Sequence, residues 1–357
     1  MLLSSKILNG NEERNIFNSQ FDDERKNTSL IKICDDSSKE NNKLYPIVQN
    51  DFTVNICSWV MALKDGEIDE FTHNTLRKQI NEDEKIEISI SDTDTRDGFK
   101  FQDIYEIKKN IRTSQIQLLQ WILYEYNMQK TNVLQLDIAE YFKAKSIKRR
   151  KENVDRFFED LDILSCINFT ANINYKGKNE IVFNKLMEFS GYGYARADTV
   201  TTNFIANKKI EYVQIRLSDW IERVNFKQFV YIDEEFFKYS AKKDSITIMM
   251  SLKLSQLVRS NNSKLKDGSY YNCKIKTILK YLNVSKNDLH KQGIKHYLNI
   301  INNSLNSLKN EGYEFMFTIS EDKPLNEILE TKIYYRNIEI SRKYNTIIRK
   351  NNKKTIH

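Results

Sequence analysis

The fold is decided by the stretch from Asn272 to Ile319, which reads NCKIKTILKYLNVSKNDLHKQGIKHYLNIINNSLNSLKNEGYEFMFTI. An amphipathic segment over 274–282 and a polar turn over 283–287 precede a helix that we expect to span 286–310. Its apolar residues follow a 4-3-4-3 spacing that places them on one helical stripe: Ile294, Leu298, Ile301, Leu305 and Leu308. Gly312 then ends the helix, and alternation over 313–319 predicts a half-buried strand. This order predicts a helix-turn-helix followed by a β wing.

The face of the second helix away from its apolar stripe carries hydrogen-bond donors. They are Lys286, Asn287, Lys291, Lys295, Asn299 and Asn302. A helix lying in a major groove presents such donors to base edges and phosphates, which predicts a DNA reader. The alternative is a polar, solvated helix without a ligand. Ser285 and Asp288 have the spacing of a helix cap, and Ser285 with Lys286 could also touch a phosphate. We expect His290 to lie at the surface.

The length, composition and charge of the whole chain limit the folds and partners that can be expected. Its 357 residues suffice for two domains, 40% hydrophobic content supports a real core, and 9 Gly with 2 Pro favour long regular elements. The formal net charge is +7, and residues 331–357 hold eight Lys/Arg against one acid, Glu339. A basic tail favours a polyanionic partner, although a solvated tail without a partner is common.

The cysteine and histidine patterns argue against disulfides and metals. Four cysteines are scattered without a CxxC pair, and four histidines supply no ligand spacing, so we expect reduced thiols and no metal site. Residues 1–8 are too short an apolar run for a signal peptide, and the window 52–63 is far below membrane-spanning length. These features predict a soluble, cytoplasmic protein.

The N-terminal part reads differently from the rest of the chain. Residues 1–45 are polar and predict a loosely attached arm. Residues 85–90 alternate as an edge strand does. The stretch 81–106 has nine acidic and three basic residues and should repel DNA. Within it, Asp92, Asp94 and Asp97 could hold a divalent ion, but a solvated acidic loop is the stronger interpretation because the distant Glu of an EF-hand loop is missing.

A second helix-turn-helix is predicted upstream. We expect a helix over 103–128, a short helix over 133–142, a basic helix over 147–161, and a hairpin formed by 166–173 and 180–183 that serves as the wing. Basic and amide side chains on its outer face could grip phosphates: Lys145, Lys148, Arg149, Asn153, Arg156, Lys176 and Lys178. A solvated basic face is the alternative, because Glu152 and Asp155 flank these side chains.

The two units have the pattern of distant internal copies. Ile138, Ala139, Tyr141 and Phe142 match Ile278, Leu279, Tyr281 and Leu282 at a spacing of 140, and Phe158 and Leu161 match Leu305 and Leu308 at 147. The second copy therefore has a turn seven residues longer. Apolar helices are expected ahead of each copy, over 115–128 and 245–258.

In the order of its elements the chain resembles the theta-type, iteron-binding (Rep_3) plasmid replication initiators. The resemblance covers roughly 100–340 and is carried by VLQLDIAEYF (133–142), YVQIRL (212–217) with FVYI (229–232), and the opening stretch with Ile300-Ile301-Asn302. It implies two winged-helix domains that bind repeated origin sites, act as monomers in initiation and often as dimers in repression, and recruit host helicase or primase. About a hundred extra N-terminal residues and an unusual joining insert depart from the family.

The expected fold is therefore α+β, with two tandem winged helix-turn-helix domains and an extra N-terminal region. We expect an arm and small extension over 1–95, domains over 96–225 and 226–342, and a basic tail over 343–357. The sequence has no P-loop and no His-hydrophobic-His pair, so no catalytic residue or cofactor is expected. The expected function is a plasmid replication initiator that binds double-stranded DNA. The alternatives are a winged-helix transcriptional regulator and a nickase hidden in the N-terminal region.

Overall fold

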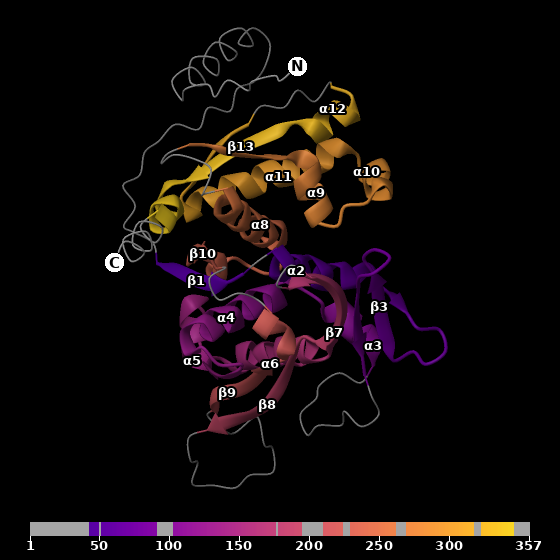
Figure 1. The fold of residues 1–357 in the computed structure, drawn as a ribbon, viewed down its shortest axis with the longest axis vertical. Coiled ribbons are helices and arrows are strands. Elements are labelled where there is room, and N and C mark those ends of the chain that lie inside the picture. Colours follow the sequence, from indigo (N-terminus) through magenta and orange to yellow (C-terminus); the bar gives the residue numbers. More distant parts are fainter. Residues whose placement is uncertain are drawn as a thin grey trace.

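The computed structural model describes residues 43–49, 51–90, 103–175, 178–194, 210–223, 229–261, 269–317 and 323–345 (Figure 1). Residues 1–42 of the arm expected over 1–45, the acidic loop at 92–97, Lys176, and the tail beyond 345 lie outside these residues. The end of the expected arm is not loose, because Leu44 and Tyr45 begin a paired strand. Helices and sheets are both abundant, and the expected α+β class is confirmed. No helix among the described residues has both the length and the apolar character needed to cross a bilayer.

The first unit joins three helices to a three-stranded sheet. Its elements are α4 (Thr113–Gln129), β5 (Val133–Asp137), α5 (Ile138–Ala144), α6 (Lys151–Ser165), β8 (Met187–Tyr194) and β9 (Ile210–Leu217). The sheet has the order β5-β9-β8, so the last strand lies between the first and the second. α4 runs through the middle of this unit and packs against α6 and β5.

The second unit repeats this arrangement. It contains α8 (Ser245–Asn261), β11 (Tyr271–Lys274), α9 (Ile275–Tyr281), α10 (Lys286–Gln292), α11 (Ile294–Leu308), β12 (Tyr313–Met316), α12 (Leu325–Glu330) and β13 (Lys332–Asn337). Its sheet has the order β11-β13-β12, again with the last strand in the middle. Residues 338–345 are helical as well.

Burial shows how the two copies correspond. Ile138, Tyr141, Phe142 and Ala144 are the buried residues of α5, and Ile275, Ile278, Leu279 and Tyr281 occupy the same positions of α9. The spacing is thus 137, and Leu161 matches the buried Leu305 at 144. The predicted spacings of 140 and 147 were wrong by three residues, because an apolar helical pattern matches itself again after about one turn. The seven-residue difference holds, and the seven-residue helix α10 accounts for it.

Three predicted helices begin or break at other residues. Residues 133–137 form a strand, because Leu134 and Leu136 alternate with exposed residues and the Asp137 carboxylate caps α5. The helix expected over 103–128 is divided into α3 (Ile104–Asn110) and α4, since the backbone at Ile111 is extended. The helix expected over 286–310 is divided at Gly293, which has φ +76° and ψ 149°.

The hairpin predicted as the wing of the first unit belongs to another sheet. β6 (Ile167–Tyr175) and β7 (Lys178–Lys185) pair as expected, but β6 also pairs with β4 (Lys85–Ser89). With β2 (Glu67–Ile68) and β3 (Thr75–Gln79) they form a five-stranded sheet of order β2-β3-β4-β6-β7. β4 is therefore an inner strand, not an edge, because the buried Ile86 and Ile88 find a partner strand far along the chain. The strands that complete the first unit's own sheet are β8 and β9.

The N-terminal and middle segments hold the units together. β1 (Leu44–Val48) pairs with β10 (Phe229–Asp233), which precedes α7 (Glu235–Lys238). β1 also packs on α4, where the Tyr45 ring contacts Trp121 of α4 and Phe237 of α7. α2 (Asp51–Ala62) contacts α8. From α2, the Ser58 hydroxyl donates to the Tyr281 carbonyl at 2.7 Å, and the Asn283 amide donates to the Ser58 carbonyl at 2.8 Å. Short 3-10 turns at Leu63–Asp65, Asp219–Arg223 and Lys309–Glu311 complete the order of elements.

We predict that Gly293→Ala lowers the free energy of unfolding by roughly 1–3 kcal/mol. A Cβ at this position would meet no atom within 4 Å, so the cost comes from the backbone conformation alone. Gly191→Ala is the matched control, because its Cβ also meets nothing within 4 Å and its φ is not positive. Urea unfolding measures both variants. Equal stability of the two would contradict a backbone constraint at the α10–α11 break.

Candidate nucleic-acid interface

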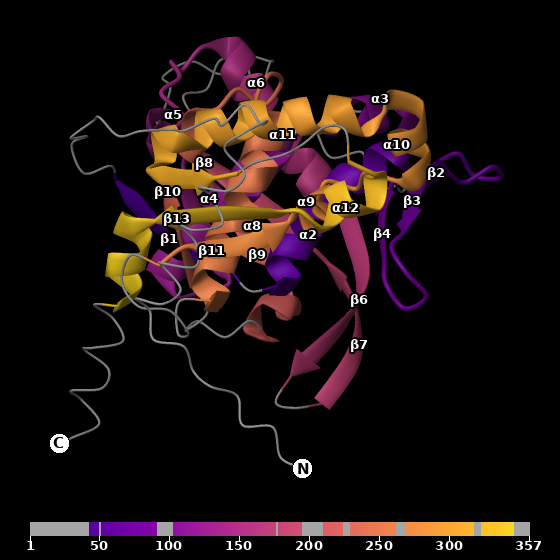
Figure 2. The ribbon, with the colours of Figure 1, turned by 90° about the horizontal axis from the view of Figure 1, so that it is seen from above.

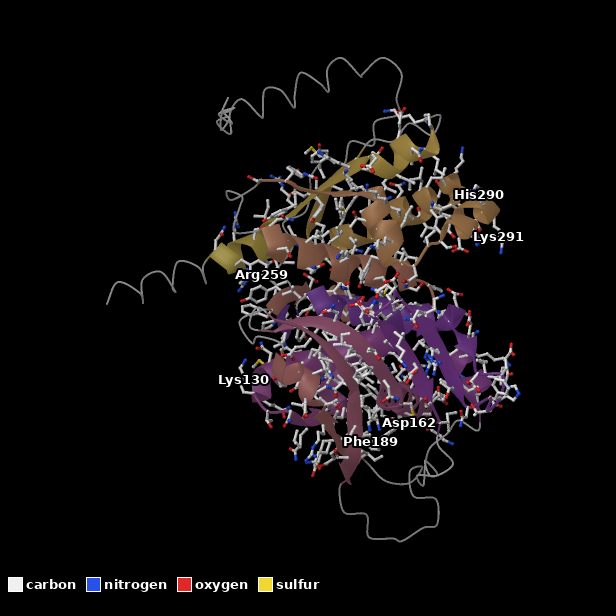
Figure 3. The ribbon with its side chains drawn as sticks, turned by 45° about the vertical axis from the view of Figure 1, so that its right-hand side comes forward. Lys130, Asp162, Phe189, Arg259, His290 and Lys291 are labelled. Carbon is white, nitrogen blue, oxygen red and sulfur yellow. The ribbon has the colours of Figure 1, made fainter. Side chains whose placement is uncertain are left out.

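α10 begins with the predicted cap. The Ser285 hydroxyl accepts the backbone N–H of Asp288 at 3.2 Å, and the Asp288 carboxylate accepts the backbone N–H of Ser285 at 2.8 Å. The Ser285 hydroxyl also donates to that carboxylate at 2.6 Å, and these bonds lower the pKa of Asp288. A carboxylate in this place disfavours a phosphate at the same helix start. The cap is therefore structural, while Lys286, Asn287, His290 and Lys291 stay exposed beside it. Figure 3 shows the last two at the outer end of this unit.

α11 has a sharp division between its buried and exposed faces. Leu298, Ile301, Leu305 and Leu308 are buried as predicted, and Ile294 is half-buried. The exposed residues of this helix are Lys295, His296, Asn299, Asn303 and Asn306. None of them is acidic, and every one has a side-chain N–H donor or can acquire one. Asn302, which was also predicted to face outward, is half-buried.

A second exposed basic surface lies where α5 leads into α6. Lys148, Arg149, Arg150 and Lys151 are consecutive and all exposed. Residues 147–150 are not helical, so four neighbouring side chains can reach solvent together, which a helix would not allow. Arg150 and Lys151 were not among the predicted residues, because a helix was expected to begin at Ile147 and helical spacing places them off its outer face. The run of four basic letters was the signal that could have identified them.

The remaining predicted residues of the first unit are placed in several ways. Arg149 donates to the Ile210 carbonyl at the start of β9, and the Asn153 amide donates to the Lys148 carbonyl at 2.7 Å. Arg156 is exposed. Lys145 instead points inward and donates to the Gln117 amide oxygen at 2.5 Å, and burial lowers its pKa to about 8. The Lys178 side chain is outside the described set.

A buried ion pair holds α6 against α4. The Arg112 guanidinium lies 3.1 Å from the Asp160 carboxylate and 3.0 Å from that of Glu159. Asp160 is only 3% exposed and also accepts the Gln115 amide at 3.0 Å. Burial raises the pKa of Asp160, and Arg112 opposes that rise. The basic end of α6 is thus mounted on a helix that is fixed by charge as well as by apolar packing.

The two helices that carry these surfaces lie toward one side of the molecule. Figure 1 separates α6 and α11 along the long axis. Seen from above, both helices lie toward the same edge, with α4 and α8 further inside (Figure 2). A rigid, extended polyanion running along the long axis could therefore meet both surfaces.

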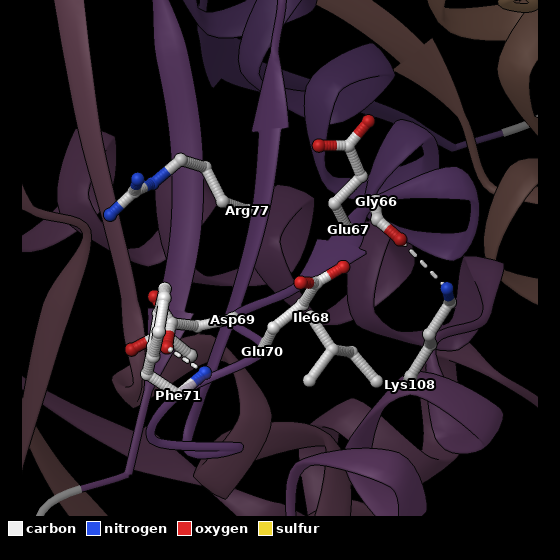
Figure 4. A pocket seen from close by; sticks show the side chains of 9 residues that line it. Gly66, Glu67, Ile68, Asp69, Glu70, Phe71, Arg77 and Lys108 are labelled. Atoms are coloured by element: carbon white, nitrogen blue, oxygen red, sulfur yellow. Dashed lines mark hydrogen bonds between the residues drawn. The ribbon is translucent and has the colours of Figure 1, made fainter.

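Other parts of the described chain are weaker candidates for a binding site. An open pocket is lined by Gly66, Glu67, Ile68, Asp69, Glu70, Phe71, Thr75, Arg77 and Lys108 (Figure 4). Its charges are mixed, the Lys108 ammonium donates to the Gly66 carbonyl at 2.7 Å, and one Asp69 oxygen accepts the N–H groups of Phe71 and Thr72. Within the described ranges, no group of three or more His, Cys, Asp or Glu residues could hold a metal ion.

Comparison with known proteins finds similar solved structures but no matching family. No family model and no curated protein matches the chain. Two crystal structures of domains 2 and 3 of RctB are similar to it. One, of selenomethionine derivatives, is 10% identical with a TM-score of 0.45 and covers 79% of this chain and 98% of that chain. The other, RctB-155-483, is 11% identical with a TM-score of 0.40 and covers 77% and 95%. Both TM-scores are low, so the functional assignment rests on this chain's own residues.

We predict that Arg112→Leu destabilises the protein by about 3–5 kcal/mol, because it leaves the Asp160 carboxylate buried without its partner. Adding Asp160→Asn should recover part of this loss, since the amide removes the uncompensated charge. Chemical denaturation of the two single variants and the double variant measures the coupling. If the changes in unfolding free energy of the two single variants add up to that of the double variant, Arg112 and Asp160 do not interact energetically.

Proposed function

We propose that this chain binds double-stranded DNA sequence-specifically and acts as a plasmid replication initiator of the iteron-binding type. Both units would be winged helix-turn-helix domains. The shared order of helices and strands, with the last strand central in each sheet, supports this interpretation. The observation that carries the proposal is that each unit exposes donors on one of two corresponding helices, at the start of α6 and along α11, and that both helices lie toward one side of the molecule.

The two units would contribute different contacts. The exposed run Lys148 to Lys151 suits phosphates, because four adjacent cations form a compact positive surface. α6 itself suits base reading less well, since Glu152, Asp155, Glu159 and Asp162 follow along its body. Apart from the capping Asp288, neither α10 nor α11 carries an acidic residue, and the lysines and amides that they expose suit the major groove.

Initiation would proceed by binding alone. The protein would occupy repeated origin sites, bend the duplex, assist opening of an adjacent AT-rich region and recruit host helicase or primase. A second copy would pair with it when it represses its own promoter, and the site of action would be the cytoplasm. The sequence contains no P-loop, so opening would draw on the energy of DNA binding. The N-terminal extension would span 1–95, and its described strand β1 and helix α2 would brace the two domains, 96–225 and 226–342. The tail over 343–357 would add non-specific affinity.

Plasmid maintenance tests the initiator function. A minimal replicon carrying the gene and its flanking tandem repeats should be lost when the gene is deleted and kept when the gene is supplied in trans. Normal maintenance of the deleted replicon would contradict initiation. If the protein bound its own promoter but maintenance did not depend on it, a winged-helix transcriptional regulator would be the better description.

We predict that Arg150→Ala and Lys151→Ala each weaken duplex binding on every sequence tested. Each loses one phosphate contact, so the slope of log affinity against log salt should become shallower by about 0.9 per substitution. Fluorescence anisotropy at several salt concentrations measures this slope. Lys85→Ala is the matched control, because Lys85 sits beside the acidic turn Glu82–Glu84 and pairs with Glu87 at 3.2 Å. A slope that Lys85→Ala changes as much as the other two would overturn the assignment.

A further inference from the structure

The exposed face of α11 forms one narrow stripe. At 100° per residue, its five exposed residues fall within an arc of about 100°: Lys295, His296, Asn299, Asn303 and Asn306. Three of the five are asparagines, and Asn302 lies at the edge of the same arc. The arrangement is that of a continuous row of amides along a helix that is anchored on its opposite face.

The asparagine amides of this stripe differ from four others that have a structural role in the fold. Asn127, Asn153, Asn283 and Asn337 each donate their amide to a backbone carbonyl and so hold turns or helix ends in place. Among the described residues, the amides of Asn299, Asn303 and Asn306 make no hydrogen bond. Asparagine is frequent in this chain, which could explain why the helix contains several. It does not explain why three of them lie on one face with amides that make no hydrogen bond.

An asparagine amide has a specific complement in duplex DNA. In the major groove, adenine presents the N7 acceptor and the N6 amino donor side by side, and an amide can bond both. Guanine presents two acceptors, which suit arginine or lysine instead. A stripe of amides with one lysine at its N-terminal end therefore matches a run of adenines more closely than a run of guanines.

The length of the asparagine stripe on α11 determines how many base pairs it can contact. From Asn299 to Asn306 the helix rises about 10.5 Å, at 1.5 Å per residue. Successive nucleotides of one strand are about 3.4 Å apart along the duplex, so this rise spans about three base steps. Three amides spaced about one helical turn apart can therefore address adjacent or alternate base pairs.

We propose that α11 reads a short adenine-rich run, about three to four base pairs long, through the amides of Asn299, Asn303 and Asn306 in the major groove. This inference rests on the proposed DNA-binding function and names the class of sequence that the second unit recognises. The first unit would add affinity without this preference, since the exposed surface at the start of α6 is cationic and the body of α6 is acidic.

Selection of duplexes from a random library by the full-length protein tests the proposal. The wild type should enrich sites that share an adenine run on one strand. Asn303→Ala should relax the preference at one or two positions of that run while the salt dependence of binding stays the same. Asn55→Ala is the matched control, because Asn55 is an exposed helical asparagine on α2. It should leave the selected sequence unchanged.

A chemical substitution in the DNA then tests the contact itself. Replacing the adenines of the selected run by 7-deazaadenine removes the N7 acceptor and keeps Watson–Crick pairing. Wild-type affinity should fall by roughly 2- to 10-fold for each contacted adenine, because one of the two hydrogen bonds of the bidentate contact is lost. Affinity of the Asn299→Ala, Asn303→Ala, Asn306→Ala triple variant should change little on the same replacement.

The outcomes separate this inference from the function on which it rests. Salt-dependent binding with a selected site that lacks an adenine run, or an equal 7-deazaadenine effect in the wild type and the triple variant, would overturn the adenine assignment and leave the DNA-binding function standing. Failure of the wild type to bind any duplex would overturn both.

Discussion

The structure depends on a single helix that belongs to two hydrophobic cores. α8 contributes Ile248, Met249 and Leu252 to the large core of the first unit and the N-terminal region. The same helix contributes Met250, Leu254 and Val258 to the core of the second unit. A helix buried on nearly all sides cannot turn without opening one core or the other, because each buried apolar side chain is worth about 1.5–3 kcal/mol. The orientation of the two units is therefore set by packing.

The N-terminal region strengthens this constraint and gives the extra residues a structural role. β1 pairs with β10, which precedes the second unit in the chain. Ser58 of α2 is hydrogen-bonded to Tyr281 and Asn283, which lead into α10. On the other side, Arg112 and Asp160 fix α6 to α4. Both exposed surfaces are thus mounted on elements that cannot shift independently. Pre-organised contact groups lose little entropy on binding, so a polyanion that fits one surface would find the other already in position.

Sequence patterns predicted the elements that depend on local spacing. The apolar stripe of α11, the cap at Ser285, the helix end at Gly312 and the apolar helices α4 and α8 were all confirmed. The pairing of β6 with β4 could not be predicted, because it joins strands about eighty residues apart. The break at Gly293 was missed because an isolated glycine can also sit within a helix. The inward turn of Lys145 was missed because it depends on Gln117, a residue of another helix. The exposed residues of the candidate interface that sequence alone indicated are Lys148, Arg149, Arg156, Lys286, Asn287, Lys291, Lys295 and Asn299. Exposure in the fold added Arg150, Lys151, Asn303 and Asn306.

The central claim is that two surfaces, fixed relative to each other, meet one side of a duplex. Hydroxyl-radical footprinting of the full-length protein on DNA flanking its own gene tests it most directly. We predict two protected patches on the same face of the duplex, about one helical turn or 34–36 Å apart from centre to centre. A single patch, or protection of opposite faces, would contradict the account.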